Sequence, residues 1–176
     1  MNRPVTDVPG RAADIGVEAI AKTAIIAKTA IIFIGIPASG KSTYYERTFA
    51  DGYEHINLDT LHTRRKELLL VDSCMQEGKS FVIDNTNPTK ADRRRYIPAA
   101  KTAGYRVEGY FFQSISKDCR ERNAKREGKA RVPDAAIGGV SSKLEMPNLD
   151  EGFDVLYFVR IIDGDFVRDN WKVELV

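Results

Sequence analysis

The sequence predicts an α/β fold with a mostly parallel, five-stranded sheet, helices on both faces and a helical lid. Two observations predict it. Short apolar runs alternate with helix-length segments along the chain, which is the order of a parallel sheet covered on both faces. The first apolar run also leads directly into a glycine-rich loop that opens a further helix.

The predicted elements follow from the apolar runs and the residues that interrupt them. Five segments are predicted to be strands: Ala30–Ile34, His55–Asp59, Phe81–Ile83, Tyr105–Phe112 and Asp154–Ile162. Four segments are predicted to be helices: Thr43–Ala50, Arg64–Glu77, Pro88–Ala103 and Ser116–Glu127. Gly78 and Gly104 follow two of these helices, at the position where a left-handed residue ends a helix.

Composition indicates one globular domain with an N-terminal extension. Residues 1–28 are predicted to be a tail and residues 29–176 the folded domain. A hexapeptide occurs twice in tandem, at Ala21–Ile26 and Ala27–Ile32, and its second copy leads into the first strand. The 27 basic and 25 acidic residues give a formal charge of +2, so any basic surface must be local.

The chain shows no feature that predicts a membrane or secreted protein. No apolar stretch approaches the ~20 residues of a membrane span, and acidic residues interrupt the N-terminus where a signal peptide would be apolar. The two cysteines, Cys74 and Cys119, lie in no metal-binding or redox spacing. A cytoplasmic protein with two reduced thiols is therefore expected.

The glycine-rich loop Gly35–Thr43 fits the phosphate-binding pattern G-x-x-x-x-G-K-[ST] at every fixed position. Backbone N–H groups of such a loop, together with the positive end of the following helix, bind phosphate oxygens. Lys41 is expected to reach the β- and γ-phosphates of a nucleoside triphosphate, and Ser42 to ligate Mg²⁺. The residues expected to contact the nucleotide here are Gly35, Pro37, Ala38, Ser39, Gly40, Lys41, Ser42 and Thr43.

Two acidic residues are expected at the carboxyl edge of the sheet, where ligands bind in folds of this class. Asp84 ends an apolar strand and is expected to hold Mg²⁺, often through water. Asp59 ends the second predicted strand and is the candidate base for an acceptor hydroxyl. The alternative for each is a helix cap, and His62 and Arg64 lie close enough to Asp59 to meet an acceptor.

Basic residues dominate the last predicted helix and its continuation. Arg122, Arg126 and Lys129 are spaced at i, i+4 and i+7, which places them on one helical face. This face predicts a lid whose arginine closes on the triphosphate, and the alternative is a solvated basic surface. The run Arg93–Arg95 is predicted to be mainly surface charge, with one member able to guide a polyanion.

Taken together, these motifs resemble those of the 5′-hydroxyl polynucleotide kinases, which have a P-loop kinase fold. The resemblance covers roughly residues 30 to 162 and rests on four elements in order: Gly35–Thr43, Asn57–Leu61, Ile83–Pro88, and the lid Arg122–Arg126 with Val132-Pro133. It implies transfer of the γ-phosphate of ATP, with Mg²⁺, to a 5′-hydroxyl end of RNA or DNA in nucleic acid repair. A separate phosphatase or ligase is an implied partner.

The resemblance also implies roles for individual residues. Asp59 would activate the hydroxyl, Lys41 and Arg126 would contact the triphosphate with Arg122 beside them, and Val132 would lie near the adenine. The residues implied at the acceptor end are Asn57, Thr60, Asn85, Thr86 and Asn87. One position departs from the pattern, because His62 stands where phage-type members have an arginine.

Two other functions remain open at this point. The same scaffold serves small-molecule kinases that act on a nucleoside, a sugar or a similar alcohol. It also serves ATP-binding switches that transfer no phosphate. A carboxylate at the position of Asp59 favours the kinases, because a switch has no acceptor to activate.

Overall fold

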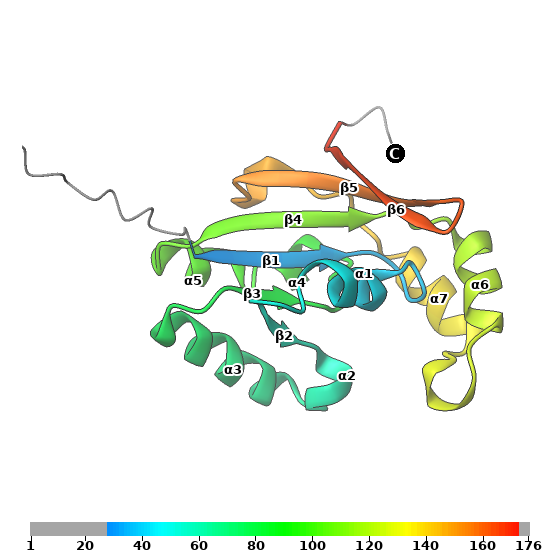
Figure 1. Cartoon of the computed structure of the whole chain (residues 1–176), viewed down its shortest axis with the longest axis horizontal. Coiled ribbons are helices and arrows are strands. Elements are labelled where there is room, and N and C mark those ends of the chain that lie inside the picture. The colour runs from blue at the N-terminus through cyan, green and yellow to red at the C-terminus, as the bar shows by residue number, and fades with distance from the viewer. Residues whose placement is uncertain (1–27, 173–176) are drawn as a thin grey trace, which may run out of the picture.

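The computed structural model describes residues 28–172 and shows a six-stranded sheet with helices on both faces (Figure 1). The strand order is β2-β3-β1-β4-β5-β6, and β1 to β5 run parallel. Their bounds are β1 Thr29–Ile34, β2 Glu54–Ile56, β3 Phe81–Ile83, β4 Arg106–Phe112, β5 Val155–Ile162 and β6 Asp165–Asn170. The predicted fold class is confirmed.

The predicted number of five strands is wrong, because β6 adds a sixth that pairs antiparallel to β5. Asp163 and Gly164 connect the two strands, and both have positive φ angles, 51° and 89°. Two such residues form the tight turn whose twist matches that of a hairpin. The Asp-Gly pair between two apolar runs was therefore an available sequence signal for this strand.

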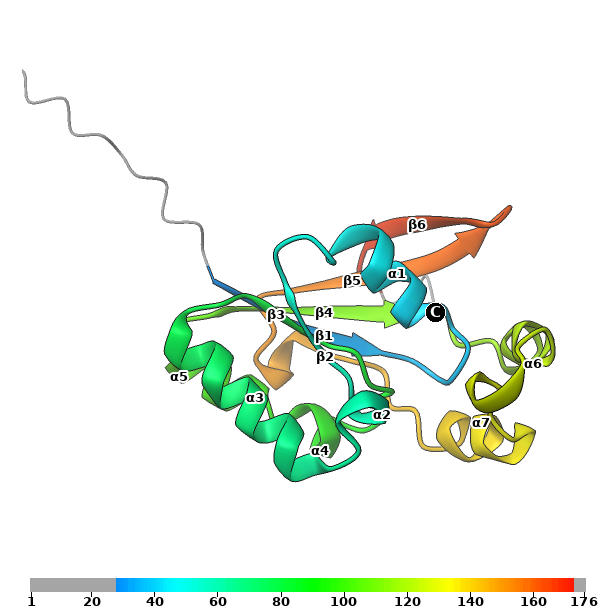
Figure 2. The same ribbon diagram turned by 60° about the horizontal axis from the view of Figure 1, so that its bottom comes forward.

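The helices cover the sheet in two layers, as Figures 1 and 2 show. Their bounds are α1 Lys41–Thr48, α2 Leu58–Leu61, α3 Arg64–Glu77, α4 Lys90–Arg93, α5 Ile97–Thr102, α6 Ser116–Ala124 and α7 Asp134–Ser141. Alternate residues of β1 separate the two cores: Ile31 and Phe33 pack with residues of α1, whereas Ile32 and Ile34 pack with residues of α3 and α5. The fully buried β1 therefore places its carboxyl end, and the loop that follows, between the two layers.

The helix predicted over Pro88–Ala103 is divided into α4 and α5. Thr89 and Asp92 form a capping box that begins α4. Pro98 lies in the first turn of α5, where a backbone N–H has no partner within the helix, so the N–H that proline lacks is not needed. The lid helix α6 ends at Ala124, earlier than predicted, so Arg126 and Lys129 lie beyond it, and the prediction of one basic helical face is wrong. The helix α7 was not predicted.

The prediction that the run Arg93–Arg95 is mainly surface charge is confirmed for Arg94 and Arg95, which are exposed, and is wrong for Arg93. Its side chain is fully buried, and its Nε and Nη2 donate to the two carboxylate oxygens of Glu151 at 2.7 and 2.8 Å. Its Nη1 donates to the carbonyl oxygens of Asn87, Pro88 and Glu145. The arginine thus joins α4 to the loop after β3 and to the segment before β5.

The first hexapeptide copy and all of the predicted tail except Lys28 lie outside the described residues, and from Lys28 on the second copy runs into β1. Within residues 28–172, no helix is long and apolar enough to cross a membrane.

Candidate active site

The phosphate loop joins β1 to α1 at the carboxyl edge of the sheet (Figure 1). Gly40 has a φ of 101°, and a Cβ at this position would lie 3.0 Å from atoms of both Ile161 and Phe166. A side chain here would therefore be strained by the backbone and also crowded by the β5–β6 hairpin. The unpredicted strand β6 thus helps to shape the loop.

Lys41 begins α1 and folds back over the loop. Its Nζ donates to the carbonyl oxygens of Gly35 and Ile36 at 3.1 and 2.9 Å, and to Ser39 Oγ at 3.3 Å. Burial lowers the pKa of Lys41 from 10.5 to about 8, against the opposing effect of the Asp84 carboxylate. A buried ammonium held at the loop is positioned to meet an anion.

Asp84 follows β3 and is almost fully buried. Its Oδ2 accepts from Asn57 Nδ2 at 3.1 Å and lies 2.9 Å from His55 Nε2. Burial would raise the pKa of Asp84, but hydrogen bonds from His55 and Ser42 and the charge of Lys41 bring it below its ordinary value. Asp84 therefore stays a carboxylate next to the first residues of α1.

The Ser42 hydroxyl and the Asp84 carboxylate form a donor set that fits Mg²⁺. Both are hard oxygen ligands, and Mg²⁺ in phosphate-loop proteins takes few protein ligands because phosphates and waters supply the rest. Within the part of the chain that the structure describes, there is no group of three or more His, Cys, Asp or Glu side chains of the kind that binds a metal unaided. The two predicted ligands thus suit an ion that arrives with a nucleotide.

Asp59 lies in the one-turn helix α2, which corrects the prediction that it ends a strand. β2 ends at Ile56, and Asn57 caps α2 by accepting a hydrogen bond from the Asp59 backbone N–H at 2.8 Å. The other end of the Asn57 amide donates to Asp84. One asparagine therefore links the candidate base to the candidate metal ligand.

The other residues predicted at the acceptor end differ in how exposed they are and in whether they already make hydrogen bonds. Thr60 and His62 are exposed, and His62 ends α2 in a left-handed conformation with a φ of 64°. Thr86 is half-buried, and its carbonyl oxygen accepts from the Gly35 N–H in the phosphate loop. Asn87 corrects the prediction of acceptor contact, because it is buried and its Nδ2 donates to the Phe33 carbonyl.

Asn85 and Arg64 are half-buried and already hydrogen-bonded. Asn85 Oδ1 accepts from the Leu58 N–H at 2.9 Å, and its Nδ2 donates to Glu67. Arg64 Nη1 donates to Glu67 Oε2 at 2.5 Å and to the Tyr96 hydroxyl at 2.6 Å. Asn85 thus connects the loop after β3 to α2 and α3, and Arg64 connects the start of α3 to Tyr96.

The lid contacts the phosphate loop through Arg122, whose Nε donates to the Ala38 carbonyl at 2.8 Å. Asn123 is buried and clamps the backbone of Val132, donating to its oxygen at 2.7 Å and accepting from its N–H at 3.1 Å. Arg126 lies past the end of α6, with its Nη1 3.4 Å from the Ala130 carbonyl. The lid is therefore anchored at two points, and Arg126 is held only weakly.

The charges of several predicted site residues affect the pKa of Lys41. Besides Asp84, the charges of Arg126 and Asp59 both act on its pKa, Arg126 lowering it and Asp59 raising it. These residues come from α2, the loop after β3 and the lid, which are far apart in the sequence. Tertiary structure thus brings these three charges near enough to Lys41 to affect its pKa.

The sequence did not predict that His55 and Asn123 belong to the site. His55, predicted only as part of a strand, bonds Asp84 and stacks on Tyr45 with a ring-centroid separation of 3.8 Å. Asn123 positions the segment that carries Val132. His55 lies in no motif, and Asn123 lies within the lid element Arg122–Arg126 without a predicted role, so the contacts of both appear only in the fold.

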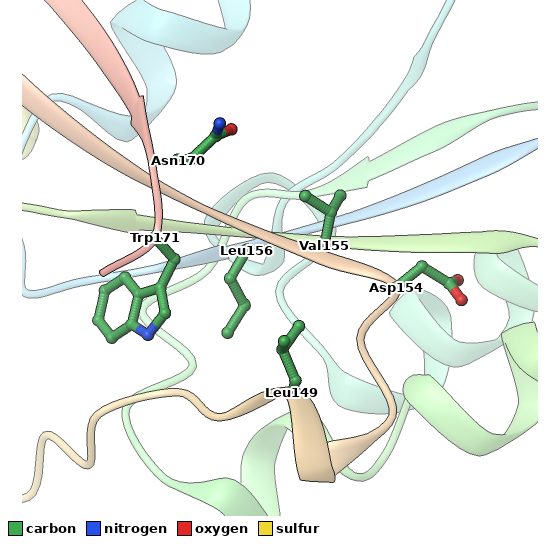
Figure 3. A pocket seen from close by; sticks show the side chains of 6 residues that line it. All are labelled: Leu149, Asp154, Val155, Leu156, Asn170 and Trp171. Carbon is green, nitrogen blue, oxygen red and sulfur yellow. The ribbon is translucent and has the colours of Figure 1, made fainter. Parts of the chain in front are cut away.

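A cavity of about 190 Å³ lies elsewhere on the sheet (Figure 3). It is lined by Leu149, Asp154, Val155, Leu156, Asn170 and Trp171. Five of them lie at or next to the start of β5 and the end of β6, and Leu149 lies in a 3-10 turn before β5, so the cavity is at the amino-terminal edge of the parallel strands. The phosphate loop is at the opposite edge, so this cavity does not belong to the candidate site.

The parallel sheet, the phosphate loop and the lid together define an α/β protein of the P-loop kinase fold. A solved structure of Kti12 from Chaetomium thermophilum, in complex with ADP-AlF3, has the same fold, with a TM-score of 0.58 and 20% identity over 77% of this chain and 90% of that one. A family model described as an AAA domain matches residues 67–147.

Curated relatives add a more specific similarity. The chain is 33% identical over 127 residues to a bifunctional polynucleotide phosphatase/kinase of Schizosaccharomyces pombe, which covers 70% of this chain and 31% of that protein. It is 32% identical over 154 residues to a protein of the same description from Acanthamoeba polyphaga mimivirus, covering 82% and 37%. The chain thus spans about a third of the length of these relatives. The resemblance to the polynucleotide kinase family is confirmed.

Proposed function

We propose that this protein is an ATP-dependent kinase that transfers the γ-phosphate of ATP to the 5′-hydroxyl end of RNA or DNA. The observation that carries the proposal is the phosphate loop with Lys41 bonded over it, beside Asp84, which Asn57 links to Asp59. The names of the two relatives support a polynucleotide acceptor, and the ADP-AlF3 bound by Kti12 supports an adenine nucleotide.

Each group of the site has a role in this reaction. The loop N–H groups and Lys41 hold the β- and γ-phosphates, and Arg122 and Arg126 cover them from the lid. Asp59 accepts the proton of the attacking 5′-hydroxyl, which then forms the new P–O bond as ADP leaves. Ser42 and Asp84 would hold Mg²⁺, which would neutralise part of the phosphate charge.

The direct test follows labelled γ-phosphate from ATP to matched RNA and DNA oligonucleotides with 5′-hydroxyl or 5′-phosphate ends. Label should reach only 5′-hydroxyl ends, and Asp59→Asn should lower kcat by about 100-fold because it removes the proton acceptor. Asp51→Asn, at an exposed turn after α1, is the matched control and should leave kcat unchanged. Equal rates in Asp59→Asn and the wild type would contradict the assigned base.

Nucleotide affinity is expected to depend on pH through Lys41. Its pKa of about 8 means that the free protein loses this charge above pH 8, whereas a bound triphosphate favours the ammonium. Binding of MgATP should therefore be about tenfold weaker at pH 9 than at pH 7. Titration calorimetry across this range measures the change. A dissociation constant that stays level from pH 7 to 9 would contradict the assignment.

A small-molecule acceptor is the second candidate, favoured by His62 at the position where phage-type kinases have an arginine. The salt dependence of acceptor binding separates the two. A polynucleotide held by several phosphates should bind much more weakly as salt rises, and a small alcohol should not. Transfer to no oligonucleotide, with ATP binding intact, would leave the small-molecule kinase.

The setting of the reaction is also part of the proposal. Cys74 and Cys119 are both free and buried, which suits a reducing, cytoplasmic compartment. A separate phosphatase or ligase would act on the other chemical groups of a broken nucleic acid strand.

A further inference from the structure

Asp59, the candidate base, lies in α2, a helix that is too short to be stable by itself. α2 is a single turn, Leu58–Leu61, and none of its residues is fully buried. One turn of helix is unstable in water unless tertiary contacts fix it. Figure 2 shows α2 beside the first turn of α3, from which such contacts can come.

Two side-chain oxygens accept the first N–H groups of α2. Asn57 Oδ1 accepts from Asp59, and Asn85 Oδ1 accepts from Leu58. Asn57 is the local cap of the helix, whereas Asn85 follows β3 and lies 27 positions after Leu58 in the sequence. The placement of α2 against the sheet therefore depends on how the Asn85 amide is oriented.

A buried carboxylate sets that orientation. Glu67 in α3 has no exposed surface, and its Oε1 accepts from Asn85 Nδ2 and, at 3.0 Å, from the Tyr96 hydroxyl. Its Oε2 accepts from Arg64 at 2.5 Å. Because a carboxylate only accepts hydrogen bonds, it forces the Asn85 NH₂ toward α3 and leaves the carbonyl oxygen facing Leu58.

Arg64, Glu67 and Tyr96 form a ring of hydrogen bonds, because Arg64 also donates to the Tyr96 hydroxyl at 2.6 Å. Every polar atom of Glu67 is engaged, and the charge of Arg64 balances that of the carboxylate. A fully satisfied buried network gives its members one arrangement. Nothing in this arrangement points Glu67 toward the phosphate loop, so contact with nucleotide does not account for its burial.

We propose that Glu67 is a positioning residue that holds Asp59 toward the acceptor hydroxyl, acting through Asn85 and the backbone of α2. This deepens the proposed function, because the alignment of Asp59 matters only if it serves as the base. Loss of the network should loosen α2 and misplace the base while leaving the phosphate loop intact. Small displacements of a reacting group are costly to the rate.

The test compares Glu67→Gln and Tyr96→Phe with Tyr105→Phe as a matched control. Tyr105 is also a buried tyrosine packed against α3, but its hydroxyl lies 2.9 Å from the carbonyl oxygens of Cys74, near the far end of that helix, and of Lys79, just beyond it. Amide hydrogen exchange of the segment 57–62 reports on α2 directly. Steady-state phosphotransfer to a 5′-hydroxyl oligonucleotide supplies kcat and the KM for ATP.

Glu67→Gln should speed exchange of the α2 amides and lower kcat, each by about tenfold, with the KM for ATP within twofold of the wild type. Tyr96→Phe should act in the same direction, by about threefold, and Tyr105→Phe should change neither quantity. If Glu67→Gln fails to fold, Tyr96→Phe carries the same test.

Unchanged exchange of the α2 amides in both Glu67→Gln and Tyr96→Phe would overturn the proposal, whatever the kinetics show. An equal loss of protection and of kcat in Tyr105→Phe would overturn it too, since general loosening of α3 would then be the cause. A wild-type protein that phosphorylates no acceptor would instead refute the proposed function. The exchange measurement would still decide whether Glu67 holds α2.

Discussion

Lys41→Met is expected to reduce phosphotransfer by about 1,000-fold, because it removes the charge that meets the β- and γ-phosphates. Methionine has a similar length and keeps the buried stem of the side chain in place. The loss should appear mainly in kcat. Label transfer from ATP at saturating acceptor measures it.

The same variant should be at least as stable as the wild type. The lowered pKa of Lys41 means that folding disfavours its charged form, at a cost of about 3 kcal/mol that is fully present below pH 8. Wild-type stability should therefore rise between pH 8 and 10.5, as the folded protein loses this proton before the unfolded chain does. Thermal melts across this range should show the rise in the wild type and not in Lys41→Met.

Lys79→Met is the matched control for both measurements. Lys79 is exposed, pairs with Glu77, and precedes β3 at the edge of the sheet opposite the phosphate loop. Its replacement should change neither kcat nor the pH dependence above. A Lys41→Met protein with more than a tenth of wild-type kcat would contradict the role of this lysine.

Arg93→Met is expected to destabilise the protein by about 3–5 kcal/mol, because it leaves the buried Glu151 carboxylate without its partner. Three carbonyl oxygens also lose the donor that Arg93 supplies. For a chain of this size, the melting temperature should fall by about 10 °C or more. Urea unfolding followed by circular dichroism gives the free energy directly.

Two further variants test whether the destabilisation comes from the burial of the Arg93–Glu151 pair rather than from the loss of an ion pair in general. Arg106→Met breaks a pair with Glu108 in which the arginine is about half exposed, and should cost less than about 1 kcal/mol. The double variant Arg93→Met, Glu151→Leu should recover much of the loss, since no buried charge is then left unpaired. If Arg93→Met proves no more harmful than Arg106→Met, the buried pair does not stabilise the fold as argued.

The fold and the phosphate loop could be predicted because their signals are local. The apolar runs mark buried strands, and the order of β1, Gly35–Ser42 and α1 requires no knowledge of distant residues. The helix α3 was predicted with its observed bounds, since Gly78 ends it in the left-handed conformation that glycine favours. The strand β6 was also locally encoded, in the Asp-Gly turn, but was not predicted.

The sequence by itself determined which chemical groups the site contains: a lysine on a glycine-rich loop, two aspartates after apolar runs and a basic lid. Tertiary structure decided their arrangement. α2 is too short to form without Asn85 and Glu67, and Arg93 is buried only because Glu151 reaches it from 58 positions away. A buried polar group needs a partner within about 3 Å, and contacts between distant segments supply that partner only when the chain is folded.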